Sequence, residues 1–154
     1  MADTSDFTKA LPHDAFAEKA ILGAMLIDNG VAGLVFSEIN SDDFYRDSHR
    51  LIAAAIEKLI NSGNRADVVT VGGKLNNNKE LNFIGGYEYL SSILDGVPEN
   101  INVEEYVRVV KDRSVLRKLM MLSLEVVKSG SEPRAETKEI ISRLQEDLIK
   151  IAVA

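Results

Sequence analysis

The stretch NVEEYVRVVKDRSVLRKLMMLSLEVVKSG, residues 102–130, decides the fold of this chain. Asn102 is suited to cap a helix, and Glu104 and Glu105 then stand in the first turn, where the helix dipole favours acids. Gly130 is a typical residue just past a helix end. The pattern therefore predicts one helix from 103 to about 129, roughly 40 Å long at 1.5 Å per residue.

A second long helix follows the turn SGSEPRAE, residues 129–136. Its apolar residues recur at helical spacing on one stripe: Ile140, Ile141, Leu144, Leu148, Ile151 and Ala152. Two long helices joined by a short turn predict an antiparallel hairpin over residues 102–154.

The first hairpin helix has more apolar residues than one neighbouring helix can cover. Between 115 and 127 they surround the helix: Val115, Leu116, Leu119, Met120, Met121, Leu122, Leu124, Val126 and Val127. A helix that packs on a single partner needs only one apolar stripe. The surplus predicts a second contact, with the front of the chain, another copy of the chain, or a different protein.

We predict that residues 11–101, the N-terminal part of the chain, form a globular head. In LPHDAFAEKAILGAMLIDNG, residues 11–30, Asp14 is an N-cap candidate and Glu18 suits the positive end of the helix dipole. The apolar residues that follow predict a helix buried on most sides, which Gly23 lets a neighbouring helix approach closely. Further helices are expected over 31–39, 48–61 and 85–96.

The segment VVTV, residues 68–71, could form a strand because it is β-branched. No other segment supplies a pairing partner, so we predict a short helix, weakened by Gly72 and Gly73. The sequence thus predicts an all-α fold, with a small multi-helix head, an antiparallel helical hairpin and a disordered tail at residues 1–10.

The composition excludes several classes of function. The 154 residues are 45% hydrophobic and 27% charged and include no cysteine, so thiolate chemistry and disulfides are excluded. The net charge of −6 argues against direct nucleic-acid binding. No apolar run is long enough to cross a membrane, and the N-terminus lacks the pattern of a signal peptide, which predicts a cytoplasmic protein.

Candidate catalytic motifs are few. Asp42, Asp43, Asp47 and His49 form the densest polar cluster, which is either a capped helix start with the histidine against Phe44 or Tyr45, or a divalent metal site. His13 fits a helix entrance, since no other ligand stands at metal-binding spacing from it.

Two other motifs do not support ligand binding. The sequence VVTVGGKLN lacks the first glycine and the final Ser or Thr of a P-loop. The basic residues of 108–118 fall on two sides of the predicted helix, as expected for solvated side chains on a helix surface.

The ordered motifs resemble the N-terminal domain of DnaB-type replicative DNA helicases. The matching stretches are LPHDAFAEKAILGAMLID, SDDFYRDSHRLI, DVVTV, IGGYEYLSSILDGVP and NVEEYVRVVKDRSVLRKL, in the order and spacing of that family. Against the family pattern, Gly72 and Gly73 replace better helix formers, so the helix that contains them is expected to be frayed.

The resemblance implies a non-catalytic collar domain of a replicative helicase. In that family the hairpins pair between subunits, as dimers or as a trimer of dimers within a hexamer, and the collar binds the C-terminal domain of primase and in some bacteria a helicase loader. It implies that Tyr89, Met120 and Val126 face the partner. The residues expected to mediate self-association are Leu116, Leu119, Met121, Leu124, Ile141, Leu144 and Leu148.

The resemblance also implies that the motor ATPase domain is absent from this chain and would follow residue 154. No cofactor is expected here, because ATP and Mg²⁺ would bind in that motor. One alternative is a free-standing adaptor or regulator of the helicase ring with the same fold. Others are a small metal-dependent hydrolase built on His49 and its neighbouring aspartates, or the helicase-binding part of a primase.

Overall fold

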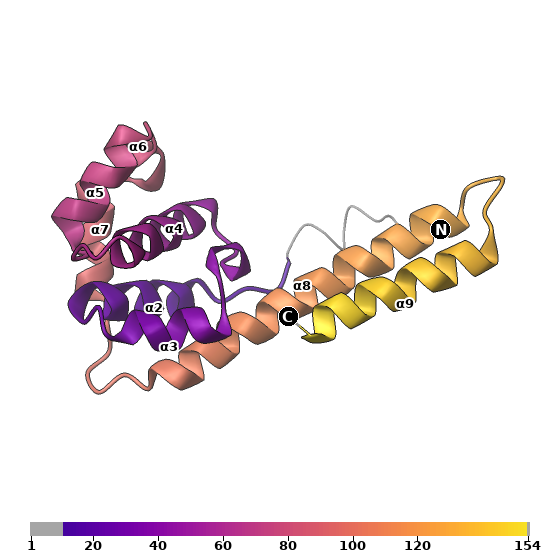
Figure 1. Ribbon diagram of the computed structural model, residues 1–154, viewed down its shortest axis with the longest axis horizontal. Helices are drawn as coiled ribbons and strands as arrows, with labels where there is room; N and C mark the ends of the chain where they lie inside the picture. The colour runs from indigo at the N-terminus through magenta and orange to yellow at the C-terminus, as the bar shows by residue number, and fades with distance from the viewer. Residues whose placement is uncertain (1–10, 154) are drawn as a thin grey trace. The chain divides into compact units, whose positions relative to one another are not determined.

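The computed structural model describes residues 11–153, and this part of the chain is helical without any strand. The predicted tail at 1–10 lies outside the described residues. The helices are α2 (Ala15–Ile27), α3 (Val31–Glu38), α4 (Asp47–Asn61), α5 (Val68–Asn77), α6 (Leu81–Ile84), α7 (Gly86–Asp95), α8 (Val103–Gly130) and α9 (Thr137–Val153), with a 3₁₀ turn, η1, at Ser41–Asp43. The predicted all-α fold is confirmed (Figure 1).

The chain forms two compact units, and α8 contributes to both of them. The head is His13–Asp112, and the hairpin unit comprises 113–153 with Leu11 and Pro12. The head therefore extends beyond residue 101, where the sequence pattern placed its end. The reason is that Val107 and Val110, in the first turns of α8, are buried in the hydrophobic core of the head.

Helix α2 is buried on most sides, as its sequence predicted. Its side chains from Ala20 to Leu26 are all buried, in a core shared with α3, α4, α5 and α7. Gly23 is the point of closest packing, because a Cβ atom there would lie 2.3 Å from Val97 Cγ2 and 2.7 Å from the Ile93 carbonyl oxygen. Glycine thus allows the end of α7 to approach the α2 backbone.

Side-chain caps fix the starts of two head helices. The Asp14 carboxylate accepts a hydrogen bond of 2.9 Å from the Ala17 N–H, which confirms Asp14 as the N-cap of α2. Asp67 and Thr70 form a reciprocal capping box at the start of α5.

Helix α5 corrects the expectation of a frayed segment at Gly72 and Gly73. The helix is continuous from Val68 to Asn77. A Cβ atom on Gly72 would lie 2.1 Å from Tyr87 Cε1, so this glycine makes room for an aromatic ring of α7. The capping box and this packing offset the roughly 1 kcal/mol that each helical glycine costs relative to alanine.

In the hairpin, α9 runs antiparallel beside the C-terminal part of α8, as predicted (Figure 1). Burial in this unit is sparse. Leu122 and Ser114 are buried on α8, whereas α9 has no buried residue. Most apolar side chains of the hairpin are thus open to a further contact. Nowhere between residues 11 and 153 is a helix long and apolar enough to span a membrane.

Candidate interaction surfaces

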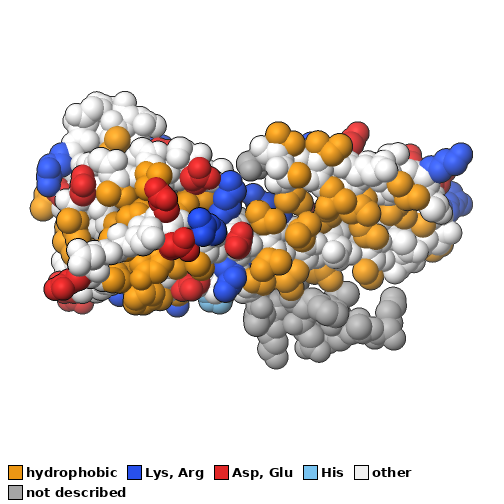
Figure 2. Space-filling view, turned by 90° about the horizontal axis from the view of Figure 1, so that it is seen from below, with side chains coloured by type: hydrophobic (Ala, Val, Ile, Leu, Met, Phe, Trp, Pro, Cys, Tyr) orange, Lys and Arg blue, Asp and Glu red, His pale blue; other side chains and the backbone are white. Residues whose placement is uncertain are grey.

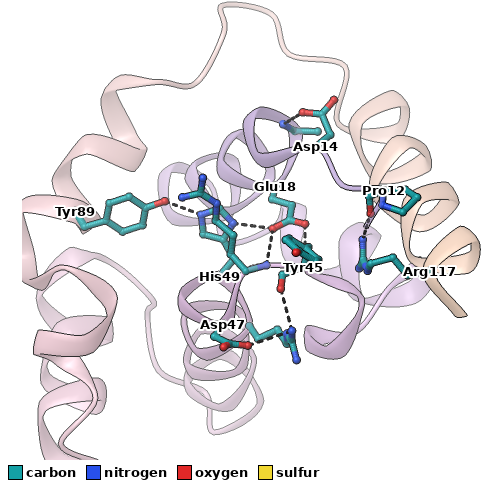
Figure 3. Close-up of polar contacts among 11 residues, drawn as sticks. Pro12, Asp14, Glu18, Tyr45, Asp47, His49, Tyr89 and Arg117 are labelled. Carbon is teal, nitrogen blue, oxygen red and sulfur yellow. Dashed lines mark hydrogen bonds and ion pairs between the residues drawn. The ribbon is translucent and has the colours of Figure 1, made fainter. Parts of the chain in front are cut away.

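A chain of buried polar side chains links three helices of the head (Figure 3). Glu18 lies on α2, His49 on α4 and Tyr89 on α7. His49 Nδ1 lies 2.7 Å from Glu18 Oε1, and His49 Nε2 lies 2.6 Å from the Tyr89 hydroxyl oxygen. Glu18 and His49 are each only 1% exposed. Buried polar side chains such as Glu18 and His49 are stable only when hydrogen bonds replace their lost contacts with water. The contacts described here provide those hydrogen bonds.

The hydrogen bonds assign the donors and acceptors along this chain. Besides His49, the Glu18 carboxylate accepts bonds from the Tyr45 N–H at 2.7 Å and the Arg46 N–H at 3.5 Å. An ionised carboxylate is only an acceptor, so His49 Nδ1–H donates to it. In the neutral imidazole, Nε2 then accepts the hydrogen of the Tyr89 hydroxyl. The phenol is therefore held by a bond directed into the head.

Tyr89 is half-buried and joins this network to the surface of the head. Burial raises the pKa of its phenol above 10.0, the positive charge of Arg46 acts to lower that pKa, and the negative charge of Glu18 acts to raise it. Lys19 Nζ lies 5.5 Å from the centroid of the Tyr89 ring, within the range of a cation–π contact. The His49 and Tyr89 rings lie nearly parallel, with an interplanar angle of 16°.

This network overturns the metal-site hypothesis for His49 and its neighbours. Both imidazole nitrogens of His49 are used by Glu18 and Tyr89. Asp43 instead accepts a bond from the Asn40 N–H, and Asp47 pairs with Arg50 at 3.1 Å. Among the described residues, no group of three or more His, Cys, Asp or Glu side chains could hold a metal ion.

The expected contact of His49 with Phe44 or Tyr45 stays a prediction, and the structure adds another aromatic neighbour for each ring. His49 packs on Tyr89, and it is His13 that stacks on Tyr45, with ring centroids 4.2 Å apart. Glu18 was assigned only to the helix dipole. Residue spacing within one helix could not reveal its partner, because His49 lies 31 residues further along the chain. The single signal in the sequence was an acid, followed by Lys19, in a helix whose other residues are apolar or glycine.

The predicted self-association residues lie on the hairpin with much of their apolar surface uncovered. Leu116, Met121, Ile141 and Leu148 are between 41% and 50% exposed, and Leu119, Leu124 and Leu144 are half-buried. Figure 2 shows hydrophobic side chains spread over the visible face of the hairpin.

Of the predicted partner-facing residues, Met120 and Val126 are half-buried on α8. A groove of about 410 Å³ lies between α8 and α9 near the turn. Val126 and Leu144 line it, together with charged residues such as Glu136 and Arg143. Apolar and charged side chains therefore line this groove together.

Three of the five basic residues of 108–118 have separate local partners. Arg108 pairs with Glu105 at 2.8 Å, Lys111 lies 3.6 Å from Glu38, and Arg117 donates a 2.7 Å bond to the Pro12 carbonyl. These contacts support the interpretation as individual surface side chains and not as one basic stripe.

Comparison with known proteins places this helical domain in one family. The family model for the DnaB-like helicase N-terminal domain matches residues 10–112. A replicative DNA helicase DnaB of Buchnera aphidicola is 31% identical over 139 residues, which are 90% of this chain and 30% of that protein. The DnaB of Treponema pallidum is 34% identical over 115 residues, 75% of this chain and 26% of that protein.

Solved structures give the same result. The crystal structure of the N-terminal domain of DnaB helicase from Mycobacterium tuberculosis matches with a TM-score of 0.84 and 31% identity, over 92% of this chain and 99% of that one. A structure described as a DnaB-like replicative helicase and its interactions with primase matches with a TM-score of 0.70 over 91% of this chain and 31% of that chain. At 19% identity, this second likeness supports the fold alone.

These findings define an all-helical domain of replicative DNA helicases. The chain belongs to the DnaB-like helicase N-terminal domain family, as the sequence motifs indicated, and this domain is the non-catalytic part of such helicases. It spans about a third or less of the length of the relatives named above.

Proposed function

We propose that this chain is the collar of a replicative DNA helicase, which assembles the ring through its hairpin and recruits primase. The observation that carries the proposal is the uncovered apolar surface of a hairpin in a chain of this family. Exposed leucine, isoleucine and methionine side chains at helical spacing suit a helix–helix interface between subunits. In this proposal, ATP hydrolysis and DNA unwinding are carried out by a separate motor domain of the parent protein. The protein acts in the cytoplasm. The helical domain described here binds no cofactor.

Self-association uses the apolar side chains on both hairpin helices. Leu116, Met121, Ile141 and Leu148 would meet the same residues of a second hairpin, giving a dimer, or a trimer of dimers within a hexamer. An isologous contact of this kind buries one patch on each subunit.

A single substitution tests the self-association surface. Met121→Asp would place a charge in the contact, and we expect dimers seen by analytical ultracentrifugation to shift towards monomer. Because Met121 is 46% exposed, the circular dichroism melting curve should stay unchanged. Loss of the fold in this variant would mean that Met121 belongs to the core of its own hairpin.

Primase recruitment would use Tyr89 on the head and Met120 and Val126 on the hairpin. A tyrosine and a methionine suit an adaptable, partly apolar contact. A helicase loader could bind the same collar. The relative described with primase supports the direction of this proposal, since it shares the fold.

Calorimetric titration with the C-terminal domain of primase from the same organism tests recruitment. Saturable binding that is weakened in Tyr89→Ala and Met120→Ala would support the collar function. As a matched control, Tyr87→Ala removes a neighbouring, 46% exposed tyrosine of α7 and should leave the affinity unchanged. Absence of binding by the parent chain would contradict the recruiting role.

A further inference from the structure

The side-chain amide of Asn29 joins the end of α2 to the start of α5. Its Nδ2 donates hydrogen bonds to the Met25 carbonyl oxygen at 2.9 Å and to the Ala66 carbonyl oxygen at 2.8 Å, and its Oδ1 accepts the Ala66 N–H at 2.9 Å. A side-chain amide has the two donors and the acceptor that these bonds need. Ala66 is fully buried and directly precedes Asp67, the N-cap of α5, so this amide clamp holds the backbone just before that helix.

The residue that follows Asn29 makes this amide chemically reactive. In the whole sequence, Asn29–Gly30 is the one place where glycine follows asparagine. Because glycine has no Cβ, its backbone nitrogen can approach the preceding side-chain amide without steric hindrance. In the reaction the Gly30 nitrogen loses its proton and bonds to Asn29 Cγ, the Cγ–Nδ2 bond breaks, and ammonia leaves. Water then opens the cyclic imide to aspartate or isoaspartate, so the net change is the hydrolysis of an amide to a carboxylate and ammonium.

The folded head holds both reacting groups away from this reaction. The Asn29 side chain is turned towards Ala66 and has to release its hydrogen bonds before Cγ can meet the Gly30 nitrogen. The Gly30 N–H donates to the Asp28 carboxylate at 2.9 Å, and this negative charge opposes removal of the proton that the attack requires. Gly30 is also fixed in right-handed helical geometry, with φ −61° and ψ −24°, at the start of α3. The intact head therefore shields a reactive sequence.

We propose that Asn29 is a site of spontaneous deamidation that becomes reactive when the head opens, and that its conversion to aspartate or isoaspartate releases the start of α5 from α2. The product carboxylate has no N–H to donate. It would face the Met25 and Ala66 carbonyl oxygens as acceptor against acceptor, so both bonds from Nδ2 are lost and the remaining contacts are repulsive. Since the lost ammonia does not return, a single opening of the head can leave a permanent change. This inference is independent of the collar function.

Peptide mapping by mass spectrometry tests the shielding. The chain is incubated at mildly alkaline pH, in native buffer and in guanidinium chloride that unfolds the head, and the amide-to-acid mass change at Asn29 is followed with time. Conversion should be at least about tenfold slower in native buffer, because opening of the head controls access to the site. In denaturant, Gly30→Ala should slow conversion by at least about tenfold. Gly33→Ala is the matched control at an exposed glycine, where an added Cβ meets nothing within 4 Å, and should leave the rate unchanged. Equal rates in the two solutions, or no conversion in denaturant, would overturn the proposal.

Hydrogen exchange of the backbone amides of 66–77 tests the release of α5. Asn29→Asp reproduces the aspartate product, and these amides should exchange at least about tenfold faster in it than in the unmodified chain. Asn64→Asp is the matched control, because it adds the same charge to an exposed residue of the loop before α5, and it should change the exchange by less than about twofold. Circular dichroism verifies folding, and Asn29→Ala, which removes the clamp without adding a charge, replaces Asn29→Asp if that variant does not fold. Unchanged exchange over 66–77 would refute the release.

Discussion

Removing the Glu18 carboxylate should greatly lower the free energy of unfolding of the head. In Glu18→Ala, buried His49 loses the acceptor at 2.7 Å and the Tyr45 N–H loses its own acceptor at 2.7 Å. Breaking a buried, hydrogen-bonded pair from one side costs about 3–5 kcal/mol. A domain of this size has only about 5–15 kcal/mol in total, and each kcal/mol lowers its melting temperature by roughly 4–8 °C. We therefore expect the melting temperature to fall by at least about 12 °C.

Urea unfolding followed by circular dichroism measures this loss, with His49→Ala and the double variant completing a mutant cycle. The double variant should lose less than the sum of the single variants, because neither buried group is then left without its partner. Asp47→Ala is the control on the same helix α4. It breaks the exposed Asp47–Arg50 pair and should cost less than about 1 kcal/mol. A Glu18→Ala loss as small as that of the control would refute the reasoning.

Four further substitutions test other features of the head. Gly23→Ala should destabilise by about 1–3 kcal/mol, since its Cβ would meet Val97 and a backbone oxygen, whereas Gly73→Ala, with nothing within 4 Å, should stabilise by up to about 1 kcal/mol in the same urea assay. Ultraviolet titration should show the Tyr89 phenol ionising at a higher pH than an ordinary tyrosine. The absorbance change at that higher pH should be absent in Tyr89→Phe. Because the folded-state pKa of the phenol is raised, folding stability should fall as the pH rises from 10 through that value. Asp67→Ala removes the α5 capping box and should cost about 1 kcal/mol in thermal melting.

The elements of the fold were predictable because their signals are local. Asp14 and the apolar spacing after it predict α2, and the long apolar helices around the turn at 129–136 predict the hairpin. The sequence did not predict helix α6, because its four residues are too few to show the apolar spacing of a helix.

The polar network was beyond prediction for a different reason. Glu18, His49 and Tyr89 come together only through tertiary packing of three helices, so no spacing rule applies to them. The same limit applies to Gly72. This residue must be small because the Tyr87 ring of another helix packs against it. Local patterns indicate which residues form a helix, but not which side chain meets which across the core.

The Glu18–His49–Tyr89 chain also has an evolutionary consequence. Because every member uses a hydrogen-bonding group of its neighbour, a substitution at one position leaves a buried polar group unmatched at another. Substitutions at these three positions should therefore occur together during evolution. Among relatives, chains that lack a histidine at the position of His49 should have replaced the acid at 18 as well, and the three positions should covary as one heritable unit.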